Sequence, residues 1–150
     1  MMMSWLKSLV KSKFVFDTNA PISAILSPLS TNATAVKLAE KLGEVIYSDA
    51  AWLEFVDVLF RKKFDSYFTI QEREEIADRF KTRFKRKQVR VSIKVCRDPK
   101  DNIILELAVS AQANCIITGD QDLLSLHPFQ GIPILTAADF IKKFWPSQHS

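Results

Sequence analysis

Acidic residues stand at positions in this sequence where a parallel sheet would bring them together. Asp17 directly follows the apolar residues 14–16, and Asp120 follows the apolar segment 115–118. A further pair lies in the segment 97–102, ahead of a predicted helix. The carboxyl ends of parallel strands meet at one edge of a sheet, so these groups are expected to meet there. The aspartates concerned are Asp17, Asp98, Asp101, Asp120 and Asp122.

Carboxylates packed side by side repel one another, which limits the chemistry they can perform. Two unit charges about 4 Å apart cost roughly 4 kcal/mol at an effective dielectric constant of about 20. Either some of the carboxyl groups stay protonated, or a cation lies between them. Oxygen ligands without histidine or cysteine favour Mg²⁺ or Mn²⁺ over zinc. Such ions bind substrate phosphates and activate water, which is the chemistry of phosphodiester hydrolysis.

Each acidic group also has a purely structural explanation that the sequence leaves open. Asp and Asn are common in the turns that follow strands and at helix N-termini. Asp101 can cap the helix that follows it, and Asp120 and Asp122 can form a turn and a cap. Asp17, at the end of an apolar strand, is the hardest to explain in this way. The joint pattern therefore carries more weight than any one aspartate.

The composition excludes several other kinds of site. The chain has 150 residues, of which 47% are hydrophobic and 25% charged, as in an ordinary globular domain. Gly43, Gly119 and Gly131 lie too far apart for a phosphate-binding loop or a dinucleotide fingerprint. Two histidines cannot build a multi-histidine metal site. The cysteines form no Cys-x-x-Cys pair, which argues against a zinc module and a disulfide scaffold.

The periodicity of apolar residues predicts the elements that must position the acidic groups. Strands are predicted at 14–16, 45–47, 89–95, 115–118 and 132–135, the third as an edge or half-buried strand. Helices are predicted at about 31–42, 50–63, 69–84, 102–113 and 136–144. Short strands that alternate with helices indicate an α/β fold. We expect a central parallel sheet covered by helices on both faces.

Positive charge is concentrated in one segment of the chain. Residues 79–94 contain eight Lys and Arg residues and no acid, so the rest of the chain carries −4 within a net charge of +4. A basic segment on an acidic body suggests a polyanionic partner, although a solvated helix end is the alternative explanation. The residues that we expect to contact a nucleic-acid backbone are Arg83, Lys85, Arg86, Lys87 and Arg90.

The two ends of the chain are expected to lie outside a single domain at 13–146. Residues 1–12 are predicted to form an extension, either a short helix or a tail, and residues 147–150 a tail. Lys7 and Lys11 interrupt the apolar residues near the start, which argues against a signal peptide. No run of eighteen apolar residues occurs, so no membrane span is expected. These observations favour a cytoplasmic protein.

Four motifs form a specific pattern through their order and spacing. They are Val-Phe-Asp-Thr-Asn at 15–19, the segment 52–59 around Glu54, Arg-Asp-Pro-Lys-Asp-Asn at 97–102, and Thr-Gly-Asp-Gln-Asp-Leu-Leu at 118–124. Together they resemble the PIN-domain family of metal-dependent nucleases, in particular its prokaryotic toxins of toxin–antitoxin pairs. The resemblance covers residues 13–144, nearly the whole chain. It implies a PIN-like three-layer α/β/α fold with four to five parallel strands.

The resemblance also implies a site of three or four carboxylates that bind Mg²⁺ or Mn²⁺. Carried over by motif, the catalytic and metal-binding residues are Asp17, Glu54, Asp101 and Asp120. Auxiliary acids or hydrogen-bonding residues are Asp98, Asp122, Thr18, Asn19 and Thr118. Glu54 enters this set through the resemblance alone. On an ideal helical wheel it lies opposite the apolar stripe, and periodicity alone predicts a solvated surface residue.

Two positions depart from the family pattern. Many toxins of the broader family carry Asn at the place of Asp120 and an acid at that of Asp122, whereas both residues are acids here. We expect Asp120 to be the nearer ligand because it directly follows Gly119, and Asp122 to cap the next turn. The other departure is the pair Ala20 and Pro21, which replaces two more usual apolar residues.

The activity that the resemblance implies is RNA hydrolysis by a metal-dependent endoribonuclease, the toxin of a toxin–antitoxin pair. Its partners would be an RNA substrate, an antitoxin protein and, in a homodimer, a second copy of the chain. One alternative is an RNA-binding module without catalysis, which would bind RNA without divalent metal. Another is a metal-dependent phosphatase or phosphotransfer domain, which would form an aspartyl phosphate. No Asp-x-Asp follows the first strand, which disfavours the phosphatase.

Overall fold

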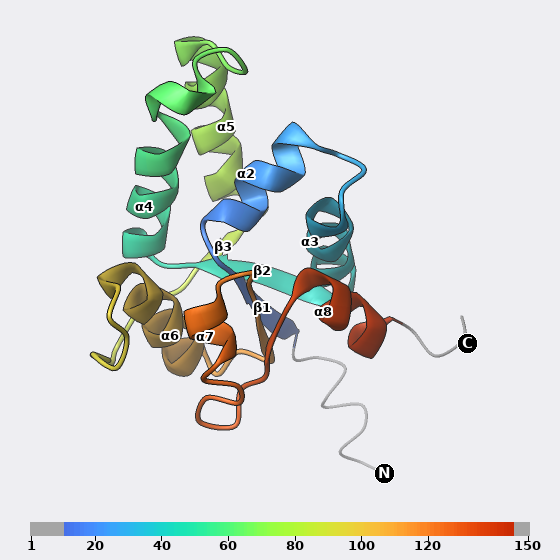
Figure 1. The fold of residues 1–150 in the computed structure, drawn as a ribbon, viewed down its shortest axis with the longest axis vertical. Coiled ribbons are helices and arrows are strands. Elements are labelled where there is room, and N and C mark those ends of the chain that lie inside the picture. The colour runs from blue at the N-terminus through green and yellow to red at the C-terminus, as the bar shows by residue number, and fades with distance from the viewer. Residues whose placement is uncertain (1–10, 146–150) are drawn as a thin grey trace.

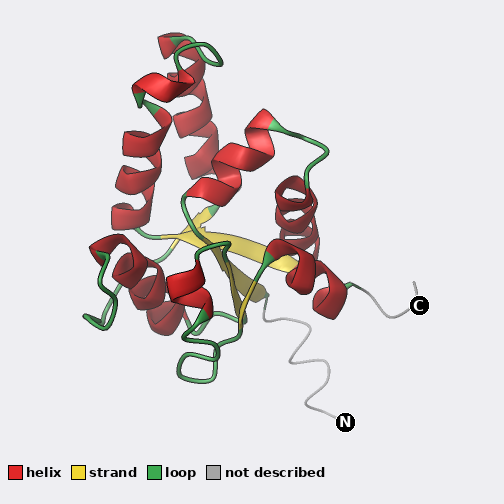
Figure 2. Cartoon of the chain, in the orientation of Figure 1, coloured by secondary structure: helices red, strands yellow, loops and turns green. Residues whose placement is uncertain are grey.

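The computed structural model describes residues 11–145, and at its centre lies a sheet of parallel strands (Figure 1, Figure 2). The strands are β1 (Ser12–Phe16), β2 (Gly43–Tyr47), β3 (Lys85–Arg86), β4 (Cys115–Ile117) and β5 (Ile134–Leu135). Their order in the sheet is β3-β2-β1-β4-β5, and every neighbouring pair is parallel. All carboxyl ends therefore lie at one edge, as predicted.

Helices cover both faces of the sheet and complete an α/β/α architecture (Figure 2). They are α2 (Asn19–Leu26), α3 (Thr31–Leu42), α4 (Asp49–Leu59), the 3₁₀ helix η1 (Lys62–Phe64), α5 (Ile70–Arg83), α6 (Pro99–Ala111), α7 (Gln121–Leu124) and α8 (Ala137–Phe144). Phe14 and Phe16 of β1 pack into the core with α3 and α8. Val15 points to the opposite face and packs with α6 and α7. The three-layer fold with five parallel strands is thus confirmed.

A third apolar cluster joins α4 to α5, which project together beyond the sheet (Figure 1). Phe55, Leu59 and Phe64 form its centre. Arg73, only 2% exposed, donates to Asp65 and to the carbonyl oxygen of Phe68, and so holds the turn between the two helices. A capping box formed by Thr69 and Glu72 opens α5. This packing fixes α4 beside the carboxyl edge of the sheet.

The edge strand predicted at 89–95 is wrong. The strand on this side is β3, and residues 87–98 form no strand. This segment lies along α6, where the side chains of Ser110 and Glu106 accept hydrogen bonds from the backbone N–H groups of Arg90 and Ile93. Val89 and Ile93 pack against the core cluster under α6. The alternation therefore reflects an extended segment packed on a helix instead of strand pairing.

Several element boundaries also differ from the prediction. Helix α4 ends at Leu59, short of the expected residue 63, and η1 follows it. Helices α2 and α7 were not predicted, because each starts within four residues of a strand end and α2 contains Pro21 in its first turn. Proline is tolerated there because the first N–H groups of a helix have no partner within the helix. Gly43 begins β2 in an extended conformation, where a Cβ would collide with the backbone of Ser12.

The expected extension and tail lie almost entirely outside the described residues 11–145. Strand β1 begins at Ser12, one residue before the expected start of the domain. Within the described part of the chain, no helix is long and apolar enough to cross a membrane.

Candidate active site at the carboxyl edge of the sheet

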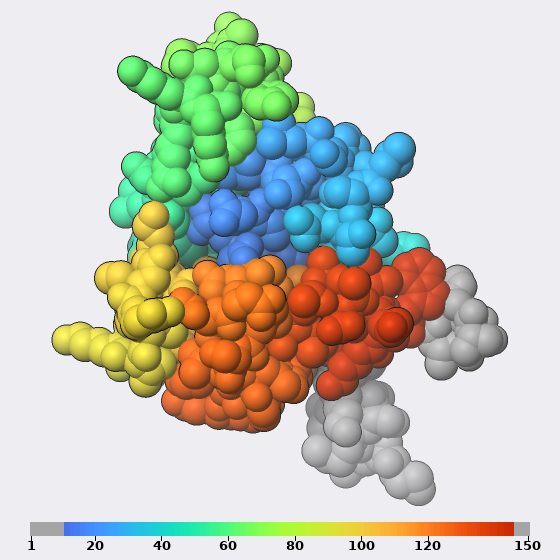
Figure 3. Space-filling model, in the orientation of Figure 1, coloured from blue at the N-terminus to red at the C-terminus, as the bar shows by residue number. Residues whose placement is uncertain are grey.

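A cleft of about 750 Å³ opens at the carboxyl edge of the sheet. The segments around α2, the start of α6 and the start of α7 meet there, and Figure 3 shows these blue, yellow and orange parts on one face. The acids that line the cleft are Asp17, Glu54, Asp98, Asp101 and Asp120, and Thr18, Asn19 and Thr118 lie beside them. The structure thus gathers eight of the nine predicted catalytic and auxiliary residues around one opening.

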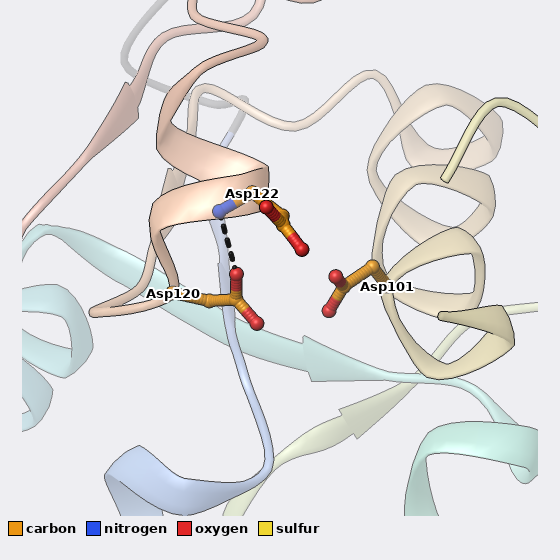
Figure 4. A group of neighbouring side chains, drawn as sticks. All are labelled: Asp101, Asp120 and Asp122. Atoms are coloured by element: carbon orange, nitrogen blue, oxygen red, sulfur yellow. Dashed lines mark hydrogen bonds between the residues drawn. The ribbon is translucent and has the colours of Figure 1, made fainter. Parts of the chain in front are cut away.

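Three aspartates form the tightest group of carboxylates in this region. Each of Asp101, Asp120 and Asp122 places a carboxylate oxygen within 4.8 Å of the others (Figure 4). Asp101 projects from α6, whereas Asp120 and Asp122 stand at the start of α7. Asp17 and Glu54 line the same cleft without belonging to this group. The tight group therefore contains two of the four predicted ligands, Asp101 and Asp120, together with Asp122, which was expected to cap the next turn.

Asp101 is the member of the cluster whose environment most requires a cation. Its side chain is buried, and its Oδ2 atom has no hydrogen-bond partner among the described residues. Burial, followed by the negative charges of Asp120, Asp98 and Asp122, raises the pKa of Asp101 to about 6. A buried oxygen without a partner, facing two further carboxylates, matches the all-oxygen ligand sets of Mg²⁺ and Mn²⁺. The residues present therefore fit such an ion.

Asp17 is connected to this cluster through Thr118. The Thr118 hydroxyl donates to Asp17 Oδ2 at 2.5 Å and accepts from the Asp120 N–H at 3.0 Å. Asp17 also accepts from the N–H groups of Ala20 and Gly119. Burial raises the pKa of Asp17 although these hydrogen bonds act in the opposite direction. Thr118 thus fixes the two strand ends relative to each other.

The helix caps in the site differ from the prediction. Asp98, not Asp101, caps α6 by accepting from the Lys100 N–H at 3.0 Å. Pro99 starts the helix, which leaves Asp101 in the first turn with its carboxylate free for the cleft. Asp120, not Asp122, caps α7: its Oδ1 accepts from the Asp122 N–H at 2.8 Å. Its other oxygen points toward Asp101 (Figure 4).

Glu54 does not lie on the solvated surface that its helical wheel predicts. Its side chain is 15% exposed, lines the cleft and pairs with Lys100 at 3.3 Å. Helix α6 packs against α4, and the wheel of a single helix contains no information about that neighbour. The resemblance, and not the periodicity, placed Glu54 in this region.

Sequence reasoning assigned no role to three cations around the acids. Lys100 pairs with Glu54, Arg61 lines the cleft, and Arg97 lies 3.4 Å from Asp122. Lys100 stands between the two aspartates of the third motif, and Arg97 directly precedes the first of them. Their place in that motif was the only feature of the sequence that pointed to a role for them in the site.

The predicted RNA-contacting residues lie away from the acidic cleft. None of the five is among the residues that line it. Arg83 pairs with Glu40 and Arg86 with Asp49, at 2.5 and 2.7 Å, and Lys87 pairs with Glu44 at 3.7 Å. Arg86 holds the pKa of Asp49 below its usual value. Lys85 and Arg90 are exposed and have no ion pair within the described chain.

Comparison with known proteins identifies the family of this chain. The sequence profile described as "PIN domain" matches residues 13–122. Among solved structures, PAE2754 from Pyrobaculum aerophilum is similar with a TM-score of 0.59 and 13% identity, over 87% of this chain and 88% of that one. VapBC2 from Rickettsia felis, bound to a DNA fragment from their promoter, is similar with a TM-score of 0.58 and 12% identity, over 81% of this chain and 96% of that one.

No curated protein sequence matches the chain. The family profile nevertheless spans more than half of the residues and includes Asp17, Glu54, Asp101 and Asp120. The chain therefore belongs to the PIN domain family.

Proposed function

We propose that this protein is a metal-dependent endoribonuclease and the toxin of a toxin–antitoxin pair. The observation that carries the proposal is the buried Oδ2 atom of Asp101, which has no partner in the described chain and faces two further carboxylates. Family membership supports nuclease activity. The structural likeness to VapBC2 supports the toxin branch.

Asp101, Asp120 and Asp122 would hold one Mg²⁺ or Mn²⁺, because their oxygens lie within 4.8 Å of one another. When bound, the ion would supply an activated water and neutralise charge on the phosphate. Asp17 stands next to this group and is oriented by Thr118. Burial raises the pKa of both Asp101 and Asp17, so their charged forms are disfavoured without a counter-ion. Glu54 lines the same cleft from α4.

The substrate assignment rests on charge around the cleft and along the edge of the sheet. Lys100 and Arg61 line the cleft itself and can bind phosphate oxygens. Strand β3 ends at the same edge, two strands from β1, which corresponds to about 10 Å. Lys85, in this strand, has no ion pair in the described chain and is available there for the backbone of a longer RNA. Arg90 also has no ion pair, but it lies farther from this edge, because its N–H group donates to Ser110 near the end of α6.

A phosphotransfer role is disfavoured by the contacts of Asp17. Both of its carboxylate oxygens accept hydrogen bonds, Oδ1 from Ala20 and Oδ2 from Thr118 and Gly119. An aspartyl phosphate would have to form on an oxygen already held by these donors. A strand-end aspartate that positions other groups agrees better with these contacts than a nucleophile does.

The deciding experiment is cleavage of a labelled single-stranded RNA with Mg²⁺ or Mn²⁺, against an EDTA control. Asp101→Asn is expected to abolish cleavage, because it removes the carboxylate with the unpartnered oxygen. Asp98→Asn is the matched control: it lies three residues away, keeps a capping oxygen and should retain most activity. RNA binding without cleavage, unaffected by EDTA, would support the RNA-binding module instead.

The partner proposals need a separate measurement. Co-expression with the product of the neighbouring gene and joint purification would test for an antitoxin. Light scattering on the isolated chain would test for the homodimer. A monomer that purifies alone and harms no host cell would contradict the toxin assignment while leaving nuclease activity open to the cleavage assay.

A further inference from the structure

Lys100 occupies an unusual position for a cation. It is the second residue of α6, directly after Pro99, and its N–H group is held by the capping oxygen of Asp98. Positive side chains are unfavourable in the first turn of a helix, because the helix dipole is positive at that end. A lysine here therefore needs a compensating interaction.

That interaction is with Glu54 of α4. The ammonium nitrogen lies 3.3 Å from Glu54 Oε1, and the Glu54 side chain is only 15% exposed. A carboxylate so little hydrated needs a cation or a proton nearby. Among the described residues, Lys100 is the only cation within ion-pair distance of it.

The acids of the cleft thus fall into two groups with different counter-charges. Asp101 and Asp120 face each other with no Lys or Arg within ion-pair distance in the described chain. Asp122, the third member of that group, has the exposed Arg97 at 3.4 Å, and Glu54 has Lys100. Glu54 is also absent from the group of carboxylates close enough to share an ion. The cleft therefore offers one set of ligands for a metal and one built-in ammonium group.

From this arrangement we infer that Lys100 takes the place of a second metal ion, so that the protein binds a single divalent ion per chain. The inference rests on the proposed metal-dependent function. The ammonium group is 49% exposed at the side-chain level and lines the cleft, so it also binds a phosphate oxygen of the substrate. Glu54 is then a positioning residue for Lys100 and not a metal ligand.

The same ion pair could instead be only a stabilising contact between α4 and α6. The two explanations differ in what happens when the ammonium is removed. If the ion pair is only a stabilising contact, removing the ammonium group would change stability and not the number of ions bound. If Lys100 substitutes for a metal ion, its removal would leave Glu54 without its cation. Glu54 and Asp17, which line the same cleft, would then be free to accept a second ion.

The test is the stoichiometry of Mn²⁺ binding to the full chain, measured by titration calorimetry without RNA. Wild type is expected to bind one ion, and Lys100→Met two, the second more weakly. Adding Glu54→Gln to Lys100→Met should return the number to one. Lys62→Met, which removes an exposed lysine outside the cleft, is the matched control and should bind one. Thermal melting of each variant shows that it is folded.

Two ions in wild type, or one ion in both wild type and Lys100→Met, would overturn the inference and leave the proposed nuclease standing. No ion in wild type would remove the proposed function and the inference with it.

The contact between Lys100 and a phosphate oxygen is tested by a separate measurement. In the Asp101→Asn background, Lys100→Met should weaken binding of a short single-stranded RNA and lower the log–log salt slope by up to about 0.7, the value for one phosphate contact, because Glu54 neutralises part of the charge of Lys100. An unchanged slope would contradict the contact.

Discussion

At the scale of single residues, Asp101 couples pH, metal binding and stability. Its pKa of about 6 in the folded protein exceeds the ordinary value of 3.8, mainly because the carboxyl is buried and secondly because other carboxylates face it. The folded state therefore holds this proton more tightly than the unfolded chain does. Stability from this group is present below pH 4 and declines as the pH rises to about 6.

The first prediction follows from the raised pKa of Asp101. A shift of about two pKa units corresponds to roughly 3 kcal/mol, and screening at the cleft opening reduces this to about 1–2 kcal/mol. Without metal, Asp101→Asn should exceed wild type in free energy of unfolding by that amount at pH 7.5, and by little at pH 4. Urea denaturation at the two pH values measures both differences. A less stable Asp101→Asn at pH 7.5 would show a structural role for this carboxylate.

Thr118 gives the second prediction. Its hydroxyl joins Asp17 to the backbone of Asp120, and its side chain is buried. Thr118→Val keeps the volume but leaves the Asp120 N–H without this acceptor and Asp17 Oδ2 with only the long contact from Gly119. It should therefore cost about 1–3 kcal/mol of stability and weaken Mn²⁺ binding. Thr118→Ser retains the hydroxyl and serves as the control. Equal Mn²⁺ affinity in the two variants would contradict a positioning role.

At the scale of elements, the start of α6 decides which acids are free. Asp98 caps the helix, so Asp101 can face the cleft from the first turn. The capping oxygen and the negative charge of Asp98 are separable properties. A hydroxyl can replace the oxygen without the charge.

The third prediction uses this separation. Asp98→Ala should lower the free energy of unfolding by about 1 kcal/mol, because an N–H group at the start of α6 loses its acceptor. Asp98→Ser should keep most of the stability and the RNA cleavage activity. Denaturation curves and initial cleavage rates measure the two effects. Loss of cleavage in a stable Asp98→Ser protein would mean that the charge of Asp98, and not its cap, matters to the site.

At the scale of the whole molecule, charge is distributed differently from what the sequence suggests. The segment 79–94 is strongly basic, yet Arg83, Arg86 and Lys87 pair with acids from α3, α4 and β2. The net positive charge of this segment therefore comes from the cations that have no such partner, including Lys85 and Arg90.

The fourth prediction compares paired with unpaired cations. The double variant Lys85→Gln/Arg90→Gln should weaken binding of single-stranded RNA and lower its log–log salt slope by about 1.4, at about 0.7 for each phosphate contact. Arg83→Gln/Arg86→Gln should change the slope less, because Glu40 and Asp49 already neutralise these residues. Fluorescence anisotropy at several salt concentrations measures both. A larger effect of the paired variants would reverse this assignment.

Much of the fold and part of the site could be predicted from sequence because the responsible forces act locally. The alternation in β1 sends Phe14 and Phe16 to one face and Val15 to the other, which is a property of any strand. The capping box of α5 involves residues three positions apart. The rule that parallel strands end at one edge placed Asp17 and Asp120 in the same cleft.

Tertiary structure alone decided the features that depend on contacts between distant segments. The packing of α6 against α4 turned Glu54 from an apparent surface residue into a cleft residue paired with Lys100. Residues 89–95 pack on α6, so their apolar and polar side chains alternate although they form no strand. The ion pairs of Arg83 and Arg86 join segments about forty residues apart. Sequence periodicity describes how one element meets an apolar core, and it contains no information about which polar group of another element lies opposite.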